Sequence, residues 1–190
     1  MSDTAFKLGK SQRDRLVNIH SRGENGLLTP IQFELEQEPE FLSGGSGLYS
    51  TASDYIRFVQ MILNKGRGNG NSLLKPETIE AMGQNHIGQI EVTRLPTEAP
   101  NLVMDIDFFP EISKKWGLGF MINMAAIPEG RSAGSLSWAG AANTHYWIDP
   151  SREIAGVIMM QVLPFCDEIC LSACSDFERG IYLELKTILC

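Results

Sequence analysis

Long hydrophobic runs are missing from this sequence, and so is any excess of positive charge. The longest apolar stretch, residues 154–165, is shorter than the roughly 18 residues that indicate a membrane span. Lys and Arg number 16 against 23 Asp and Glu, giving a net charge of −7, whereas proteins that bind a phosphate backbone need a basic surface. We therefore expect neither a membrane nor nucleic acid as a partner.

A recognisable signal peptide is also missing. Met1-Ser2-Asp3-Thr4 opens the sequence without a basic segment, and no apolar segment follows it. The N-terminus does not determine the compartment, and the cytoplasm is the favoured expectation.

Cysteine is scarce, with four residues in the chain. Cys166, Cys170 and Cys174 lie at i, i+4 and i+8, which stacks them along one face of a predicted helix, where they are badly placed to bridge each other. No histidine lies near them in sequence, as a zinc site of this kind would need. The spacing therefore favours buried, reduced cysteines, and we expect neither a metal nor a cofactor.

Histidine is scarcer still, and His20, His86 and His145 lack the H-E-x-x-H spacing of a metalloprotease. His145 lies in a predicted strand beside a bend at Gly140, so its ring could face a cleft. A histidine whose ring is hydrogen-bonded within the strand is the favoured interpretation.

A serine nucleophile is not recognisable either, because no G-x-S-x-G elbow occurs. Ser72-Leu73-Leu74-Lys75 is formally an S-x-x-K sequence. Pro76 disfavours the helical conformation at Lys75 that would place this lysine beneath Ser72. We interpret this match as structural.

The chain is predicted to be a single partial domain, 1–190, in four parts. Residues 1–42 form a covering segment with a short helix around 11–18, 43–83 are helical, 84–115 form a loop, and 116–190 contain antiparallel strands and a C-terminal helix. Apolar spacing predicts a helix over 51–65, with Thr51 as N-cap and the Asp54 side chain reaching back to complete a capping box. Pro76 opens a short helix that ends near Met82.

The last third of the chain alternates in the manner of strands over 116–123, 135–138, 143–148 and 153–162. The helix expected over 167–189 carries an apolar stripe, Ile169, Ala173, Phe177, Ile181 and Leu185. These elements predict an α/β (α+β) fold, in which an antiparallel sheet of about three strands is flanked by the 51–65 helix and the C-terminal helix.

Small residues dominate the segment Gly134–Thr144. A strand edge of this composition lets a ligand approach the backbone closely, and a backbone N–H beside a reactive serine can act as an oxyanion donor. Composition alone fits an ordinary bulged strand equally well.

Trp138-Ala139-Gly140 resembles the K-T-G box of serine β-lactamases and penicillin-binding proteins, and more closely the W-x-G form of related carboxylesterases. Other segments resemble the same superfamily in the same order along the chain: Met1–Thr4, Gly44–Leu48 with Ser50–Asp54, Trp116–Phe120, Tyr146–Pro150 and Ile154–Gln161. The chain is therefore similar to the C-terminal portion of the β-lactamase/transpeptidase-like fold.

This resemblance implies that Trp138, Ala139 and Gly140 line the acyl pocket and that the Ala141 N–H is the second oxyanion donor. It places the nucleophile in an S-x-x-K box upstream of this chain, together with a Y-x-N box, so no catalytic residue lies here. Trp138 replaces a lysine that would contact a β-lactam carboxylate, which favours esters as substrates.

The expected function is that of the C-terminal part of a serine hydrolase, a β-lactamase-related esterase that forms an acyl-enzyme from a small ester or amide. β-Lactamase, peptidase and esterase activities are not separated by these motifs. The chain alone is expected to be inactive, and to pair with a missing segment, self-associate through an exposed sheet edge or be marginally stable. The alternative is a non-catalytic, truncated hydrolase that acts as a binding or interaction protein, and the DNA upstream of the Met1 codon discriminates the two.

Overall fold

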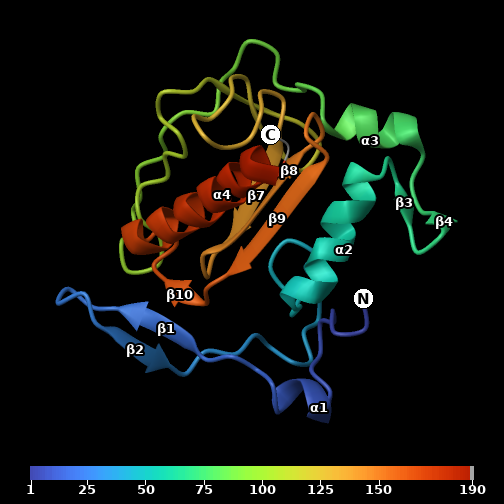
Figure 1. Ribbon diagram of the computed structural model, residues 1–190. Coiled ribbons are helices and arrows are strands. Elements are labelled where there is room, and N and C mark those ends of the chain that lie inside the picture. Colours follow the sequence, from blue (N-terminus) through green and yellow to red (C-terminus); the bar gives the residue numbers. More distant parts are fainter. Residues whose placement is uncertain (189–190) are drawn as a thin grey trace.

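The computed structural model describes residues 1–188 and is built around a five-stranded antiparallel sheet (Figure 1). The strands follow one another in chain order: β5 Lys114–Trp116, β6 Met121–Asn123, β7 Leu136–Gly140, β8 Thr144–Asp149 and β9 Ile154–Met159. Helices α2 (Ala52–Leu63) and α4 (Glu168–Ile188) flank the sheet. The predicted α+β class is confirmed, with more strands than the sequence indicated. No helix within residues 1–188 is long and apolar enough to cross a membrane.

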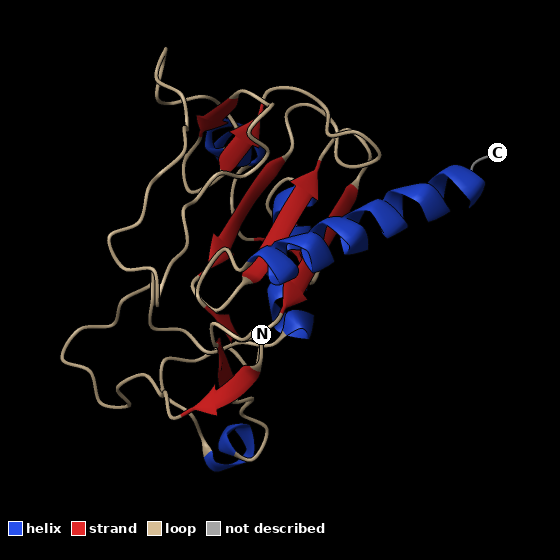
Figure 2. Ribbon diagram, turned by 90° about the vertical axis from the view of Figure 1, so that its left-hand side faces the viewer, coloured by secondary structure: helices blue, strands red, loops and turns tan. Residues whose placement is uncertain are grey.

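Side chains along β8 alternate between the two faces of the sheet, and each face is covered by a helix. Tyr146 and Ile148 belong to the core that contains Val59 and Ile62 of α2. Trp147 points to the other face, where its ring lies 5.7 Å from that of Phe177 on α4. Successive side chains of a strand point to opposite faces, so α2 and α4 cover opposite sides of the sheet. Figure 2 shows α4 crossing the strands.

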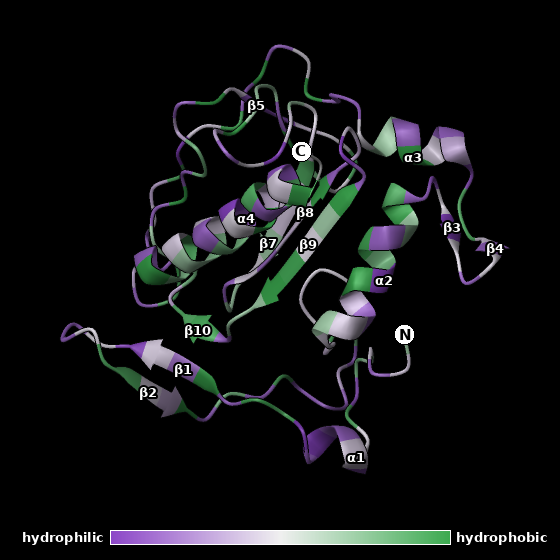
Figure 3. Ribbon diagram, viewed as in Figure 1, coloured by the Kyte–Doolittle hydropathy of each residue, from purple (hydrophilic) through white to green (hydrophobic). Residues whose placement is uncertain are grey.

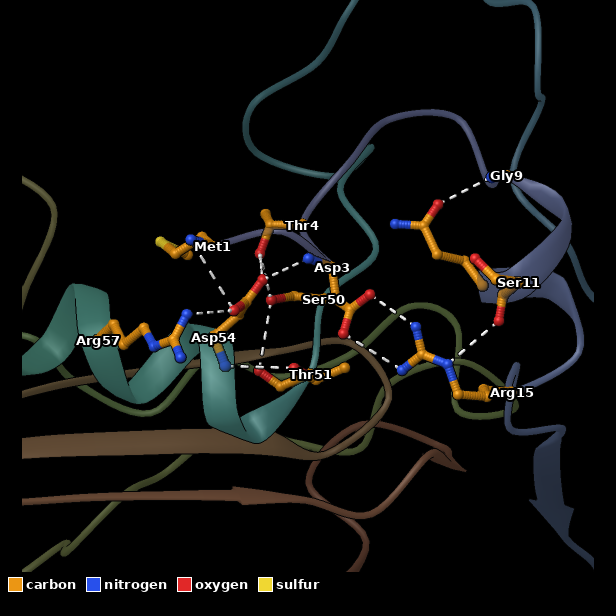
Figure 4. Close-up of polar contacts among 11 residues, drawn as sticks. Met1, Asp3, Thr4, Gly9, Ser11, Arg15, Ser50, Thr51, Asp54 and Arg57 are labelled. Atoms are coloured by element: carbon orange, nitrogen blue, oxygen red, sulfur yellow. Dashed lines mark hydrogen bonds and ion pairs between the residues drawn. The ribbon is translucent and has the colours of Figure 1, made fainter.

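The N-terminus of α2 confirms one half of the predicted capping box and corrects the other. The Thr51 side chain accepts a hydrogen bond from the Asp54 N–H at 3.2 Å. The Asp54 carboxylate does not reach back to Thr51. It accepts instead from the Asp3 N–H at 2.7 Å and from the Thr4 hydroxyl at 3.1 Å, and so fastens the first residues of the chain to the helix (Figure 4).

The predicted strand over 116–123 is wrong in one respect, because a tight turn divides it into β5 and β6. Gly119 has a φ of +92°, a backbone conformation that residues other than glycine rarely adopt. A Cβ at Gly117 would lie 2.1 Å from the Met82 carbonyl oxygen. The two glycines therefore make a hairpin out of the segment.

The first part of the chain is more ordered than a covering segment. After a one-turn helix, α1 (Lys10–Arg13), the strands β1 (Ile19–Arg22) and β2 (Leu28–Ile31) form a hairpin. β1 also pairs in parallel with β10 (Val162–Leu163), giving a small three-stranded sheet beside the main one (Figure 1). The prediction missed it because β10 is short and distant in sequence.

Helix α4 confirms the predicted C-terminal helix, while Leu189 and Cys190 lie outside the described residues. Its buried face contains Cys170, Cys174, Glu178 and Tyr182. Both of these cysteines and Cys166 are buried and free, as predicted. Cys166 does not share their helix face, because it precedes α4 and has a φ of +61°. The predicted apolar stripe lies beside this buried face and is only partly covered, with Ile169 59% exposed and Phe177, whose ring contacts Trp147, 40% exposed. Part of this stripe lines an open apolar groove that runs past Ile154 and Ala155 of β9 to Ile56 on α2.

The predicted short helix is confirmed as α3, which spans Pro76–Met82 with the proline in its first turn. The sequence did not predict the hairpin before it, in which the short strands β3 (Arg67–Gly68) and β4 (Asn71–Ser72) pair within a part expected to be helical. Lys75 has extended backbone angles, φ −76° and ψ 147°. It therefore does not lie one helical turn after Ser72, which supports the structural interpretation of this S-x-x-K match.

Candidate functional site

The four predicted site residues lie together at the end of β7 and in the turn that follows. Trp138 and Ala139 are half-buried, whereas Gly140 and Ala141 are exposed. On one side, β8 pairs with the whole of β7. On the other side, β6 pairs with Ser137 and Leu136 and its register ends there. Residues 138–140 therefore present a backbone edge without a strand partner among residues 1–188.

Aromatic rings surround the start of this open edge. The ring of Trp138 makes an edge-on contact with Trp116 of β5, with centroids 4.6 Å apart. Phe108, from the long segment before β5, lies 6.2 Å from Trp138 and 6.0 Å from His145. The edge consequently has apolar walls, which suit the carbon skeleton of an acyl group.

Gly140 keeps the edge accessible. A Cβ built there would meet only Thr144, at 3.7 Å, which is an ordinary contact. The glycine is therefore not required by packing within this chain, and its effect is to leave space above the strand.

The turn after β7 is held by Asn143, a residue that the sequence interpretation overlooked. Its side chain is fully buried and its φ is +54°. The amide donates to the carbonyls of Val162 and Pro164, both at 2.8 Å, and accepts from the Cys166 N–H at 3.0 Å. Asparagine is enriched in the left-handed conformation, which was the one available signal.

His145 corrects the prediction of a hydrogen-bonded strand histidine. Its ring lies on the α4 face of β8 and is 7% exposed. Among residues 1–188, Nε2 has no hydrogen-bond partner. Burial, with a smaller effect from the charge of Arg131, lowers the pKa of His145 to about 4, so the ring is neutral at pH 7.

Two polar networks support the sheet behind the site. Arg131 and Glu178 form a buried ion pair, in which Nε donates to Oε1 at 2.9 Å and the Arg131 backbone N–H donates to the same oxygen. Asp149 accepts from the Ser132 N–H at 2.8 Å and from the Tyr182 hydroxyl at 2.9 Å. Burial by itself would raise the pKa of Asp149, but these hydrogen bonds hold it below its usual value.

The other histidines are not part of this site. His86 is exposed in the loop after α3, where its ring contacts the Ala81 carbonyl at 2.7 Å. His20 lies in β1, and its backbone N–H donates to the Gln161 carbonyl. The described residues therefore bring together apolar walls and an open strand edge without assembling a nucleophile and base.

The antiparallel sheet, the helices on both of its faces and the small-residue strand edge define a β-lactamase-type α+β fold. The chain belongs to the beta-lactamase family, whose model matches residues 1–168.

Two curated relatives show how much of a complete protein this chain represents. It is 28% identical over 184 residues to Protein Rv1367c of Mycobacterium tuberculosis, covering 91% of this chain and 42% of that protein. It is 28% identical over 199 residues to ML-236A carboxylate methylbutanoyltransferase mlcH of Penicillium citrinum, covering 98% of this chain and 46% of the relative. The chain thus spans less than half the length of these relatives.

Solved structures agree on the fold. A variant of simvastatin synthase from Aspergillus terreus superposes with a TM-score of 0.76 at 21% identity, covering 98% of this chain and 47% of the other. EstCE1, a hydrolase with promiscuous acyltransferase activity, gives a TM-score of 0.58 at 21% identity, covering 84% of this chain and 41% of the EstCE1 chain. These structures confirm the predicted α+β fold, while the predicted superfamily is confirmed by the family model that matches residues 1–168.

Proposed function

We propose that this chain forms one wall of the active site of an acyl-transferring serine hydrolase, with small carboxylic esters as substrates. The observation that carries the proposal is the open edge of β7 at residues 138–140. It continues into Ala141 and has the Trp138 and Phe108 rings beside it. The names of the relatives agree in chemistry, since they include an esterase and acyltransferases.

In the proposed reaction, the hydroxyl oxygen of a serine outside this chain attacks the ester carbonyl carbon while a base takes its proton. The Ala141 N–H and the N–H of that serine stabilise the negative charge on the carbonyl oxygen. The bond to the alcohol oxygen breaks, and the alcohol leaves with a proton. Water then attacks the acyl-enzyme, which releases the carboxylic acid and restores the serine. A second alcohol in place of water gives acyl transfer.

The preference for esters over β-lactams rests on Trp138. A lysine at this position would supply a cation for the carboxylate of a β-lactam, whereas the indole ring in contact with Trp116 supplies an apolar surface. An uncharged acyl chain fits such a wall better than a carboxylate does.

The first test reads the DNA upstream of the Met1 codon for an in-frame S-x-x-K and Y-x-N. If both are present, the extended chain is produced beside the 190-residue chain, and each is treated with a fluorophosphonate probe that labels reactive serines. We expect labelling and ester hydrolysis from the extended chain alone. Labelling of the 190-residue chain would contradict the proposal, because it would place the nucleophile within these residues.

A non-catalytic binding protein is the second candidate, and it rests on the lack of an assembled nucleophile within residues 1–188. A stop codon preceded directly by a ribosome-binding site upstream of Met1 would favour it. The short chain would then bind an ester without releasing alcohol, which equilibrium dialysis with a non-hydrolysable ether analogue detects.

A further inference from the structure

A cavity of about 250 Å³ continues the open edge of β7 onto the α4 face of the sheet. Ser137 and Ala139 line it, together with Trp147, which is paired with Ser137 across the two strands. Residues paired in this way point to the same face of a sheet, and Trp147 faces α4. The cavity therefore belongs to the candidate site, as the space beside the edge that the acyl group is proposed to follow.

The outer wall of the cavity comes from the segment before β5, and contacts within the chain fix it in place. The ring of Phe108 lies 6.2 Å from that of Trp138. The ammonium group of Lys114 donates to the Phe109 carbonyl at 3.0 Å, and the guanidinium of Arg131 lies 5.3 Å from the Phe109 ring. Phe109 has a φ of +51°, which is uncommon for so large a residue. The wall is thus held in one particular conformation, and the cavity beside it is preformed.

The charged groups in the cavity wall already have partners. Arg131 and Glu178 form an ion pair in which both side chains are buried. Asp107 lies 3.8 Å from the ammonium group of Lys114. The rest of the lining is mostly apolar and aromatic. A charged group that entered the cavity would lose its water and find no free counter-charge among residues 1–188, so the cavity favours an uncharged occupant.

The position of the cavity along the edge determines which carbon atoms of an acyl chain reach it. Its lining along β7 ends at Ala139, two residues before Ala141, whose N–H is the proposed oxyanion donor. A strand rises about 3.3 Å per residue, so about five carbon–carbon bonds of about 1.5 Å separate the ester carbonyl from the cavity. An apolar cavity of about 150 Å³ holds a benzene molecule, so the cavity has room for several carbon atoms beyond the fifth bond.

We propose that the cavity receives the end of an uncharged acyl chain longer than about five carbons, and that Leu171 of α4 determines how long this chain can be. The inference rests on the proposed function and names its substrate class. Leu171 is half-buried and lines the cavity from the side of α4, so the size of its side chain changes the room that is left. Each further CH₂ group that the cavity buries strengthens binding about fourfold.

The test uses 2-alkanones, which have the carbonyl group and the chain of an acyl group but cannot be hydrolysed. 2-Pentanone, 2-heptanone and 2-nonanone imitate butanoyl, hexanoyl and octanoyl groups. Each is titrated into the 190-residue chain, and binding is followed by tryptophan fluorescence, since Trp138 and Trp147 line the cavity. We expect the step from 2-heptanone to 2-nonanone to strengthen binding by about tenfold or more. The step from 2-pentanone to 2-heptanone should give a smaller gain, because those carbons lie along the open edge.

Three variants locate the binding. Leu171→Phe fills part of the cavity and should remove the gain from 2-heptanone to 2-nonanone, whereas Leu171→Ala should keep it and extend the rise to 2-undecanone. Ile181→Lys changes the separate apolar groove on the same helix. It is the matched control and should keep the gain. The circular dichroism of each variant establishes that it is folded.

Equal gains in the two steps would overturn the proposal, as would a gain that survives Leu171→Phe or is lost in Ile181→Lys. Failure of 2-nonanone to bind at its solubility limit would overturn it too. These measurements are independent of the fluorophosphonate labelling of the extended chain. Labelling without the dependence on chain length would contradict the acyl cavity alone, and the dependence on chain length without labelling would contradict the acyl-transfer reaction alone.

Discussion

The side-chain amide of Asn143 donates to the Val162 carbonyl at 2.8 Å, which ties the turn after β7 to a strand of a different sheet. The same side chain also contacts the backbone of Pro164 and Cys166. Together with the Val162 N–H, which donates to the Ala142 carbonyl, this buried residue fixes where Ala141 lies relative to β10.

Asn143→Ala is expected to destabilise the chain by about 2–4 kcal/mol, because two buried backbone groups and one partly buried one lose their partner and alanine is strained at a φ of +54°. Asn143→Gly is the matched control, since it loses the same bonds without the strain. Urea unfolding should find it about 1 kcal/mol less destabilised than the alanine variant. Equal losses would show that backbone strain is irrelevant at this position.

Glu178→Gln tests the buried ion pair. It leaves the guanidinium of Arg131 buried without its counter-charge, and loss of one partner of such a pair costs about 3–5 kcal/mol. Glu184→Gln, on an exposed side of the same helix, should change the free energy of unfolding by less than about 0.5 kcal/mol. Similar small effects from both changes would rule out a stabilising role for the pair.

Acidification should destabilise the fold through His145. The folded state keeps this ring neutral down to a pKa of about 4, while in the unfolded chain it takes a proton near pH 6.5. Between these values the unfolded state binds more protons, so stability falls as pH falls, by up to about 3 kcal/mol.

This dependence on pH is measured by urea unfolding between pH 7 and 5. His145→Phe should flatten the slope, whereas His86→Gln should leave it unchanged. Below about pH 4 a further loss comes from carboxylates such as Asp149 and Asp54, whose pKa values are lowered in the folded state. An unchanged slope in His145→Phe would assign the effect to other groups.

The 190-residue chain is expected to self-associate when it is studied alone. β9 pairs with β8 and forms an edge of the sheet among residues 1–188, and the apolar groove between α2 and α4 runs beside it. Figure 3 colours β9 as hydrophobic, and Ile154 and Ala155 of this strand line the groove. Unpaired edges and apolar faces of this kind promote association.

Sedimentation velocity tests the role of the groove. Ile181→Lys places a charge in its wall, and this variant should sediment more slowly than the unaltered chain. Ile169→Lys, on the same helix at a residue 59% exposed and away from the groove, is the matched control. A monodisperse, cooperatively melting monomer at tens of micromolar would contradict the prediction.

In the extended enzyme, Ala141→Pro removes the backbone N–H proposed as oxyanion donor. Loss of one such donor lowers kcat about 10²- to 10³-fold, with a smaller effect on KM. Ala142→Pro alters the same turn without removing that N–H, so it controls for distortion. If steady-state hydrolysis of p-nitrophenyl butyrate falls equally in both variants, the turn rather than the Ala141 donor is responsible.

The sequence predicted those parts of the fold that are determined by local signals, such as helix caps and apolar periodicity. Helix α2 has both an N-cap and an apolar face, and α3 begins with Pro76. The site strand was found through its resemblance to a family motif. The small residues that dominate Gly134–Thr144 describe an accessible edge in general and do not identify a ligand.

The remaining features depend on contacts between distant residues. The segment 116–123 turns at Gly117, where the Met82 carbonyl lies so close to the backbone that no side chain fits. The Asp54 carboxylate binds Asp3 rather than its own helix cap. Helix α4 buries a stripe adjacent to its apolar one, since Glu178 meets Arg131 there. Periodicity cannot reveal such partners, because each is supplied by another part of the chain.

The pairing of β1 with β10 has a consequence for how the protein is made. His20 aligns with Val162, and Arg22 binds Asp167. During synthesis the first forty residues leave the ribosome long before these partners exist, since chains are made from the N-terminus at about 5–20 residues per second. The strand β10, which completes the sheet of the β1–β2 hairpin, is therefore synthesised several seconds after that hairpin. Contacts so distant in sequence also form slowly, so this small sheet is expected to be among the last parts of the newborn chain to become protected from proteases.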